Sequence, residues 1–150
     1  MPVQIAHIFE LVGRCLASCH IIESQIYKHS VAIRVAEESS SNSHINELDF
    51  FAEISKLQKR KSHNVRINEI GQKAPKLWSQ NDIELLHEAR KLRNEIAHTY
   101  VSENSELFDH PEGLIDLIND LYLKRDFLNN VSGKVLETLE RFNTQVEMLK

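Results

Sequence analysis

The sequence predicts an all-α protein, an up-and-down bundle of four to five antiparallel helices in which the first and last helices are long. Only 4 glycines and 3 prolines occur in 150 residues, which leaves few breakers for the many turns of a β fold. Apolar residues instead recur at steps of three and four over long stretches. The chain is 41% apolar and 27% charged, which argues against disorder, and residues 1–150 fit a single domain.

The first helix is expected over residues 3–37, because the polar run 39–43 ends its apolar pattern. The apolar stripe consists of Ile5, Ile8, Val12, Cys15, Cys19, Ile22, Ile26 and Ile33. His29 occupies the one slot of this stripe that no apolar residue fills. Cys15 and Cys19 lie four residues apart on the stripe, so we interpret them as core residues and as neither a disulfide nor metal ligands.

Two shorter helices are expected next. The inner face of the first is predicted to consist of Leu48, Phe50, Phe51, Ile54 and Leu57. This helix ends in the basic run 59–61. The second covers about 65–72 and is closed by Gly71 and Pro75.

A third major helix is expected to begin at a capping box formed by Asn81 and Glu84 and to reach about Tyr100. Its core stripe is predicted to be Leu85, Ala89, Leu92 and Ile96. Three other apolar residues, Ile83, Leu86 and Ala97, then fall on the outer face, where a partner subunit could cover them.

The last helix is predicted from a seven-residue apolar repeat. The repeat runs through Leu114, Leu121, Leu128, Val135, Phe142 and Leu149, supported by Ile118, Leu139 and Val146. It keeps its phase across residues 129–133, so we expect one long helix with a possible kink there.

Charge is distributed unevenly along the chain. The net charge is −4, but residues 56–93 carry ten Lys/Arg against four Asp/Glu, which is a local +6. A site for a polyanion is therefore expected in this middle third. The run Lys59, Arg60 and Lys61 is a candidate contact to an RNA backbone, although such a run is more often a solvated face.

The third major helix gathers residues that suit acid–base and phosphate chemistry. At 100° per residue, the flank and back of the wheel, outside the predicted core stripe, carry His87, Arg90, Arg93, Asn94 and His98. A histidine exchanges a proton near neutral pH, and an arginine holds a phosphate oxygen with two hydrogen bonds. These are the two requirements of RNA cleavage by its own 2′-hydroxyl, and no metal is needed in principle.

Residues 93–98, Arg-Asn-Glu-Ile-Ala-His, resemble the R-X4-6-H signature of the HEPN superfamily, and Tyr100 extends the resemblance to the R-X4-H-X-Y form of HepT-type toxins. The resemblance implies a small, cofactor-free, metal-independent endoribonuclease whose homodimer brings two Arg/His pairs together across a cleft. It implies that Arg93 binds the scissile phosphate and that His98 is the general base or acid. Asn94 would orient His98 or the phosphate.

The same resemblance implies a toxin–antitoxin or defence role, with RNA cleaved by transesterification to a 2′,3′-cyclic phosphate. Tyr100 would be the residue that a nucleotidyltransferase-type antitoxin modifies. Arg90 and His87 are candidate RNA contacts because they share the face of His98.

Other interpretations remain open at this point. Arg93 could pair with an acidic neighbour such as Glu95, His98 could cap the helix C-terminus, and Tyr100 could simply pack. The superfamily also contains non-catalytic members, so a helical regulator or protein-interaction module is the alternative. The N-terminus lacks the pattern of a signal peptide and no apolar run reaches bilayer length by inspection, so a soluble, cytoplasmic protein without a membrane segment is expected.

Overall fold

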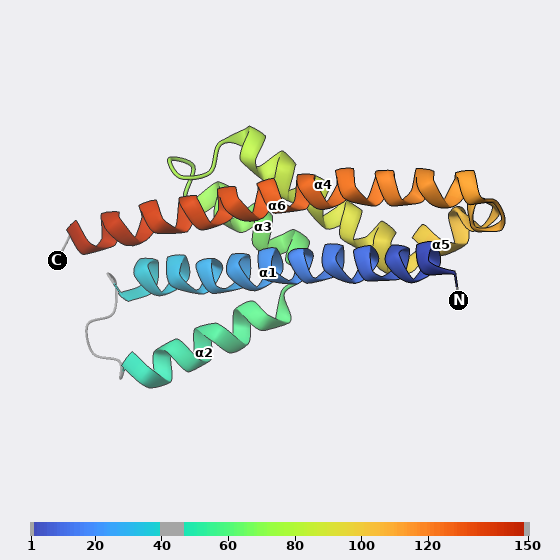
Figure 1. Cartoon of the computed structure of the whole chain (residues 1–150). Helices are drawn as coiled ribbons and strands as arrows, with labels where there is room; N and C mark the ends of the chain where they lie inside the picture. The colour runs from blue at the N-terminus through green and yellow to red at the C-terminus, as the bar shows by residue number, and fades with distance from the viewer. Residues whose placement is uncertain (1, 40–46, 149–150) are drawn as a thin grey trace. The chain divides into compact units, whose positions relative to one another are not determined.

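The computed structural model of the chain describes the backbone of residues 2–39 and 47–148 (Figure 1). Within these residues it has six α-helices, one 3₁₀ helix and no strand. The elements are α1 (Val3–Ser39), α2 (Glu47–Arg60), α3 (His63–Lys73), α4 (Gln80–His98), α5 (Tyr100–Glu103), the 3₁₀ helix η1 (Ser105–Asp109) and α6 (Pro111–Met148). The predicted all-α bundle with long first and last helices is confirmed. The helix beyond the expected four to five is α5, which has four residues.

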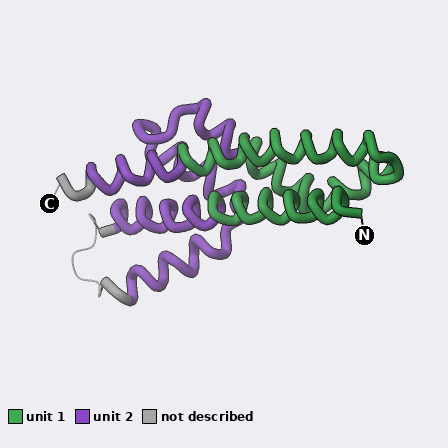
Figure 2. Tube along the Cα trace, viewed as in Figure 1, with its two compact units in different colours: residues 1–22, 88–134 green, residues 23–87, 135–150 purple. Residues whose placement is uncertain are grey.

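The helices form two compact units (Figure 2). Unit 1 comprises Met1–Ile22 and Glu88–Lys134, and unit 2 comprises Glu23–His87 and Val135–Lys150. Helices α1, α4 and α6 each contribute residues to both units. Each unit is described by itself below.

The core of unit 1 joins the first half of α1 to the first half of α6. Its buried side chains include Ile8, Leu11, Cys15, Cys19, Ile96, Tyr100, Leu114, Leu117, Leu121 and Leu128. Polar contacts link the same helices, since Ser18 donates to Asn129 over 3.1 Å and His7 lies 2.9 Å from the hydroxyl of Tyr122. Residue numbers rise together along the two helices, so α1 and α6 run parallel in this unit. The reason is that α4 returns through unit 1 before α6 begins.

The core of unit 2 lies between the second half of α1, the helices α2 to α4 and the second half of α6. Buried side chains include Ile26, His29, Val31, Ile33, Ile54, Ile67, Ile70, Leu77, Trp78, Ile83, Leu86, Val135 and Thr138. Trp78 donates a hydrogen bond from Nε1 to Nε2 of His29 over 2.9 Å. The ring of Phe142 meets the ring of His29 edge-on at 4.9 Å. The histidine in the apolar stripe is therefore a core residue with a defined partner.

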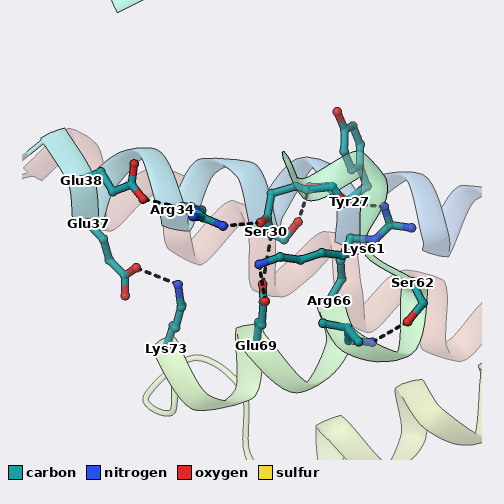
Figure 3. A network of polar contacts seen from close by, with 12 residues as sticks. Tyr27, Ser30, Arg34, Glu37, Glu38, Lys61, Ser62, Arg66, Glu69 and Lys73 are labelled. Carbon is teal, nitrogen blue, oxygen red and sulfur yellow. Dashed lines mark hydrogen bonds and ion pairs between the residues drawn. The ribbon is translucent and has the colours of Figure 1, made fainter. Parts of the chain in front are cut away.

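A polar network ties α2 and α3 to α1 in unit 2 (Figure 3). The buried amide of Gln58 accepts from Arg34 and donates to Glu69, each over 3.1 Å. Glu69 also pairs with Lys61, and Lys73 pairs with Glu37 of α1 at 2.9 Å. Two of the basic residues in the middle third thus have acidic partners inside the unit.

The predicted inner face of α2 is partly wrong. Phe51 and Leu57 are 54% and 40% exposed, whereas Ile54 and Gln58 are buried. The two buried positions are four residues apart, which keeps them on one side of the helix, whereas steps of three drift around it. Gln58 occupies a core position because Arg34 and Glu69 satisfy its amide. The side chain of Leu48 lies outside the described residues.

Helix α6 is continuous from Pro111 to Met148, as the heptad repeat predicts. The repeat positions Leu114, Leu121, Leu128 and Val135 are all buried. Gly113 lies where η1 approaches the first turn of α6, and a Cβ built there would fall 2.2 Å from the carbonyl oxygen of Leu107. Leu149 and the side chain of Val146 lie outside the described residues.

Helix α1 has the length and composition of a membrane-spanning segment. Within Val3–Glu38, an 18-residue window has a mean hydropathy of 1.4, and 28% of that window is buried. This differs from the expectation that no apolar run is long enough. Core helices that are mostly buried and signal sequences meet the same criterion, so it does not by itself assign α1 to a membrane.

Candidate functional site

The helix that carries the predicted site is α4. The helix begins at Gln80, and its N-cap is Ser79 and not the predicted Asn81, because Ser79 and Asp82 form the capping box. Asp82 accepts from the backbone N–H of Ser79 over 2.9 Å, and Ser79 Oγ accepts from the N–H of Asp82 over 3.1 Å. The prediction of Asn81 and Glu84 as the box is therefore wrong. The capping box places the carboxylate of Asp82 in the first turn of α4, where its negative charge also interacts favourably with the helix dipole.

The inner stripe of α4 is rotated from the predicted one. Its buried apolar residues are Ile83, Leu86, Ala89 and Ile96, while Leu85 and Leu92 are only half-buried. Ile83 and Leu86, which we expected on an outer face, lie in the chain's own core. Of the three residues assigned to a covered outer face, only Ala97 is exposed.

The rotation changes the position of Arg93. On a helical wheel it lies between Leu86 and Ala89, so its side chain leaves the helix on the inner side, and it is half-buried. Its Nη1 donates to Oδ1 of the neighbouring Asn94 over 3.3 Å. We expected Asn94 to orient His98 or the phosphate, so this hydrogen bond between Arg93 and Asn94 was not predicted.

His98 is the last residue of α4 and is exposed, as is Asn94. Five residues separate Arg93 from His98, which corresponds to about 140° around a helix. Asn94 lies about 40° from His98 and is its nearer neighbour on the wheel. One copy of α4 therefore presents His98 and Asn94 outward, whereas Arg93 leaves the helix on the inner side.

Tyr100, two residues after His98, is packed and is 1% exposed. Its hydroxyl donates to Oδ2 of Asp120 over 2.8 Å, and Nζ of Lys124 lies 5.9 Å from the ring centre. Burial, together with the adjacent carboxylate of Asp120, raises the pKa of the phenol well above its usual range. In this conformation the hydroxyl is not accessible to a modifying enzyme. Tyr100 is therefore a packed residue, which was the alternative left open by the sequence.

The two remaining candidates on α4 belong to different units. Arg90 is half-buried in unit 1, whereas His87 belongs to unit 2 and hydrogen-bonds Oδ1 of Asn68 over 2.8 Å. His87 and Asn68 also line a pocket of about 460 Å³ whose wall includes Trp78 and Ile83.

In the basic run, Lys59 and Arg60 are exposed and Lys61 pairs with Glu69. Lys61 is therefore half-buried and held by a carboxylate, whereas Lys59 and Arg60 lie exposed. Among the described residues, no group of three or more His, Cys, Asp or Glu side chains is placed to hold a metal ion.

Asp120 is the residue at this site that sequence reasoning missed. It anchors Tyr100 and also accepts from Lys124 over 3.2 Å. The i,i+4 spacing of Asp120 and Lys124 could have predicted their ion pair. Nothing in the sequence links Asp120 to a tyrosine twenty residues earlier. Comparison of the chain with known protein families, with curated proteins and with solved structures gave no match.

Proposed function

We propose that the protein is a metal-independent endoribonuclease of the HEPN type, acting on RNA in the cytoplasm as a toxin or defence component. The observation that carries the proposal is the hydrogen bond of Arg93 to Asn94 on the helix that ends in the exposed His98. These three residues occupy the positions of the R-X4-6-H signature, in a chain whose described residues form an all-α bundle.

The chemistry assigned to each residue follows from its side chain. Arg93 donates two N–H groups to the scissile phosphate and stabilises the charge that builds on it in the transition state. His98 takes the proton of the 2′-hydroxyl, whose oxygen then attacks the phosphorus. The bond from phosphorus to the 5′-oxygen breaks, and the protonated His98 returns its proton to that oxygen, so the products are a 2′,3′-cyclic phosphate and a 5′-hydroxyl.

A homodimer forms part of this proposal. Arg93 and His98 leave the helix about 140° apart, which one helix cannot bring to the same phosphate without a further element. A second copy of α4 across a two-fold axis supplies a second Arg93 and His98, so that a composite site forms from both copies.

The proposal is tested by incubating purified protein with single-stranded RNA in EDTA. We expect cleavage with cyclic phosphate ends, and a loss of at least about 100-fold in both Arg93→Ala and His98→Ala. The matched control is Lys91→Ala, which removes an exposed cation from the same helix and is expected to retain activity. Circular dichroism and sedimentation velocity report whether helicity and dimerisation persist in each variant.

Cleavage that survives both substitutions would contradict the proposal, and so would activity that depends on a divalent cation. A monomer with full activity would overturn the composite site alone. A nucleotidyltransferase-type antitoxin is the expected partner, and its transfer of a nucleotide to Tyr100 requires that the buried hydroxyl first leave Asp120.

The alternative, a helical protein-interaction module, is favoured by one feature of α2. Phe51 and Leu57 are exposed on this helix, and Leu57 lines a surface pocket with Lys56 and Arg60. A partner protein whose binding weakens in Phe51→Ser and Leu57→Ser, with no RNA cleavage under any condition, would favour this alternative.

A further inference from the structure

Outside the predicted site, unit 1 carries an exposed cluster of four polar side chains on α1 and α6. Oη of Tyr122 lies 2.9 Å from Nε2 of His7 and shares a hydrogen bond with it. The other ring nitrogen of His7, Nδ1, lies 3.6 Å from a carboxylate oxygen of Glu10. Glu10 in turn accepts a 2.6 Å hydrogen bond from Arg14. The atoms form a chain from a phenol through an imidazole to a carboxylate.

The order of these groups favours one tautomer of His7. The Arg14 guanidinium lowers the pKa of Glu10, so Glu10 is a carboxylate at neutral pH. A negative charge beside Nδ1 favours the tautomer with its proton on Nδ1, which leaves the lone pair of Nε2 facing the hydroxyl of Tyr122. The hydroxyl is then the donor in this hydrogen bond, and His7 is placed to remove its proton.

This is the arrangement that activates a hydroxyl nucleophile: a base in hydrogen-bond contact and a third group that orients the base. We propose that Tyr122 is an acceptor site for an acyl group, with His7 as its general base and Glu10 as a positioning residue. The phenolic oxygen forms a bond to the acyl carbon while the bond from that carbon to the leaving group breaks. His7 takes the phenolic proton and returns it to the leaving group, so the product is an aryl ester.

The neighbouring side chains favour an acyl donor over a phosphoryl donor. Arg14 is the cation of the cluster, and it is engaged with Glu10, whose negative charge would repel a phosphate. Exposed apolar residues lie nearby along each helix: Val3 one turn before His7 on α1, and Ile115 two turns before Tyr122 on α6. An uncharged electrophile with an apolar tail suits these surroundings.

The inference goes beyond the ribonuclease proposal and shares no residue with it. It is tested with N-acetylimidazole as the acyl donor on the intact protein, with the acetylation rate of each tyrosine measured by peptide mass spectrometry. Tyr122 is expected to react first, ahead of Tyr27 and the buried Tyr100. Its rate is expected to fall at least tenfold in His7→Phe and by a smaller factor in Glu10→Gln.

The matched control is His20→Phe, which replaces an exposed histidine on the same helix and is expected to leave the rate unchanged. The pH dependence of the acetylation rate distinguishes activation of Tyr122 by His7 from a high rate that reflects only the exposure of Tyr122. In the unmodified sequence the rate should follow the titration of His7 measured by NMR, and in His7→Phe it should rise in proportion to hydroxide. Equal rates in His7→Phe and the parent, or a pH profile that does not change, would overturn the proposal.

Discussion

Trp78 donates its indole N–H to Nε2 of His29, so the proton of the neutral imidazole resides on Nδ1. Both side chains are buried in unit 2. Protonation of His29 would remove the acceptor that Trp78 uses and would place a charge in the core. Burial accordingly lowers the pKa of His29 to about 4.

This shift makes folding stability depend on pH in a defined window. Above pH 6.5 the imidazole is neutral in both the folded and the unfolded state. As the pH falls from 6.5 towards 4 the unfolded state binds a proton that the folded state does not, so stability decreases by about 3 kcal/mol in total. Urea unfolding followed by Trp78 fluorescence at pH 7 and at pH 4.5 measures the loss. In His29→Gln, whose amide keeps an acceptor without titrating, the pH dependence should be weaker by this contribution. An unchanged dependence would contradict the assignment.

The contact between η1 and α6 predicts that alanine substitutions at two glycines of α6 change stability in opposite directions. Gly113→Ala is expected to cost about 2 kcal/mol or more, since the new Cβ would fall against the backbone of Leu107. Gly133→Ala, on the same helix, meets nothing within 4 Å and should stabilise the protein by about 0.5–1 kcal/mol through helix propensity. Thermal unfolding monitored by circular dichroism compares the two variants. Equal effects would mean that η1 does not hold this close approach in solution.

The capping box of α4 predicts which polar residue stabilises the helix start. Ser79→Ala removes the oxygen that accepts from the N–H of Asp82, and is expected to cost about 1 kcal/mol. Asn81→Ala, two residues later and exposed, is expected to change stability by less than about 0.5 kcal/mol. Chemical denaturation of both variants decides between the two caps, and a larger loss in Asn81→Ala would restore the cap expected from sequence.

The hydroxyl of Tyr100 is expected to contribute modestly to stability. Tyr100→Phe keeps the packing and removes the hydrogen bond to Asp120, which still has Lys124 as a partner. A loss of about 1 kcal/mol is therefore expected. Asp120→Asn should cost less, because an amide oxygen still accepts from Tyr100. Differential scanning calorimetry of both variants provides the measurement, and a Tyr100→Phe protein as stable as the parent would show that this bond does not stabilise unit 1.

The long helices were predictable because their patterns are long. The stripe of α1 and the heptads of α6 repeat often enough to fix which side is buried, and Leu114, Leu121, Leu128 and Val135 are all in the core. The relative direction of α1 and α6 was left open by the sequence, since in an up-and-down bundle it depends on whether four or five helices alternate. A periodic pattern specifies a face and carries no information on direction.

The rotation of α2 and α4 could not be obtained from the sequence for a different reason. Both helices carry apolar residues on more than one side, and both bury a polar residue, Gln58 in α2 and Asp82 near the start of α4. Those polar residues are tolerated because partners satisfy them, Arg34 and Glu69 for Gln58 and the N–H of Ser79 for Asp82. Such partners lie on other segments or at the helix cap, and a hydrophobic periodicity contains no information about them. Because the predicted buried face of α4 was rotated from the observed one, Ile83 and Leu86 were assigned to an outer face. For the same reason Arg93 was expected outside the core stripe, although it leaves the helix on the inner side.

The division into two units leaves each with its own natural reporter. The chain has one tryptophan, Trp78, in unit 2, and two cysteines, Cys15 and Cys19, both buried in unit 1. Fluorescence therefore follows the opening of one unit, while the reaction of the thiols with an alkylating reagent follows the opening of the other. Without any substitution in the sequence, the two signals distinguish a protein that unfolds in a single step from one whose two units unfold one after the other.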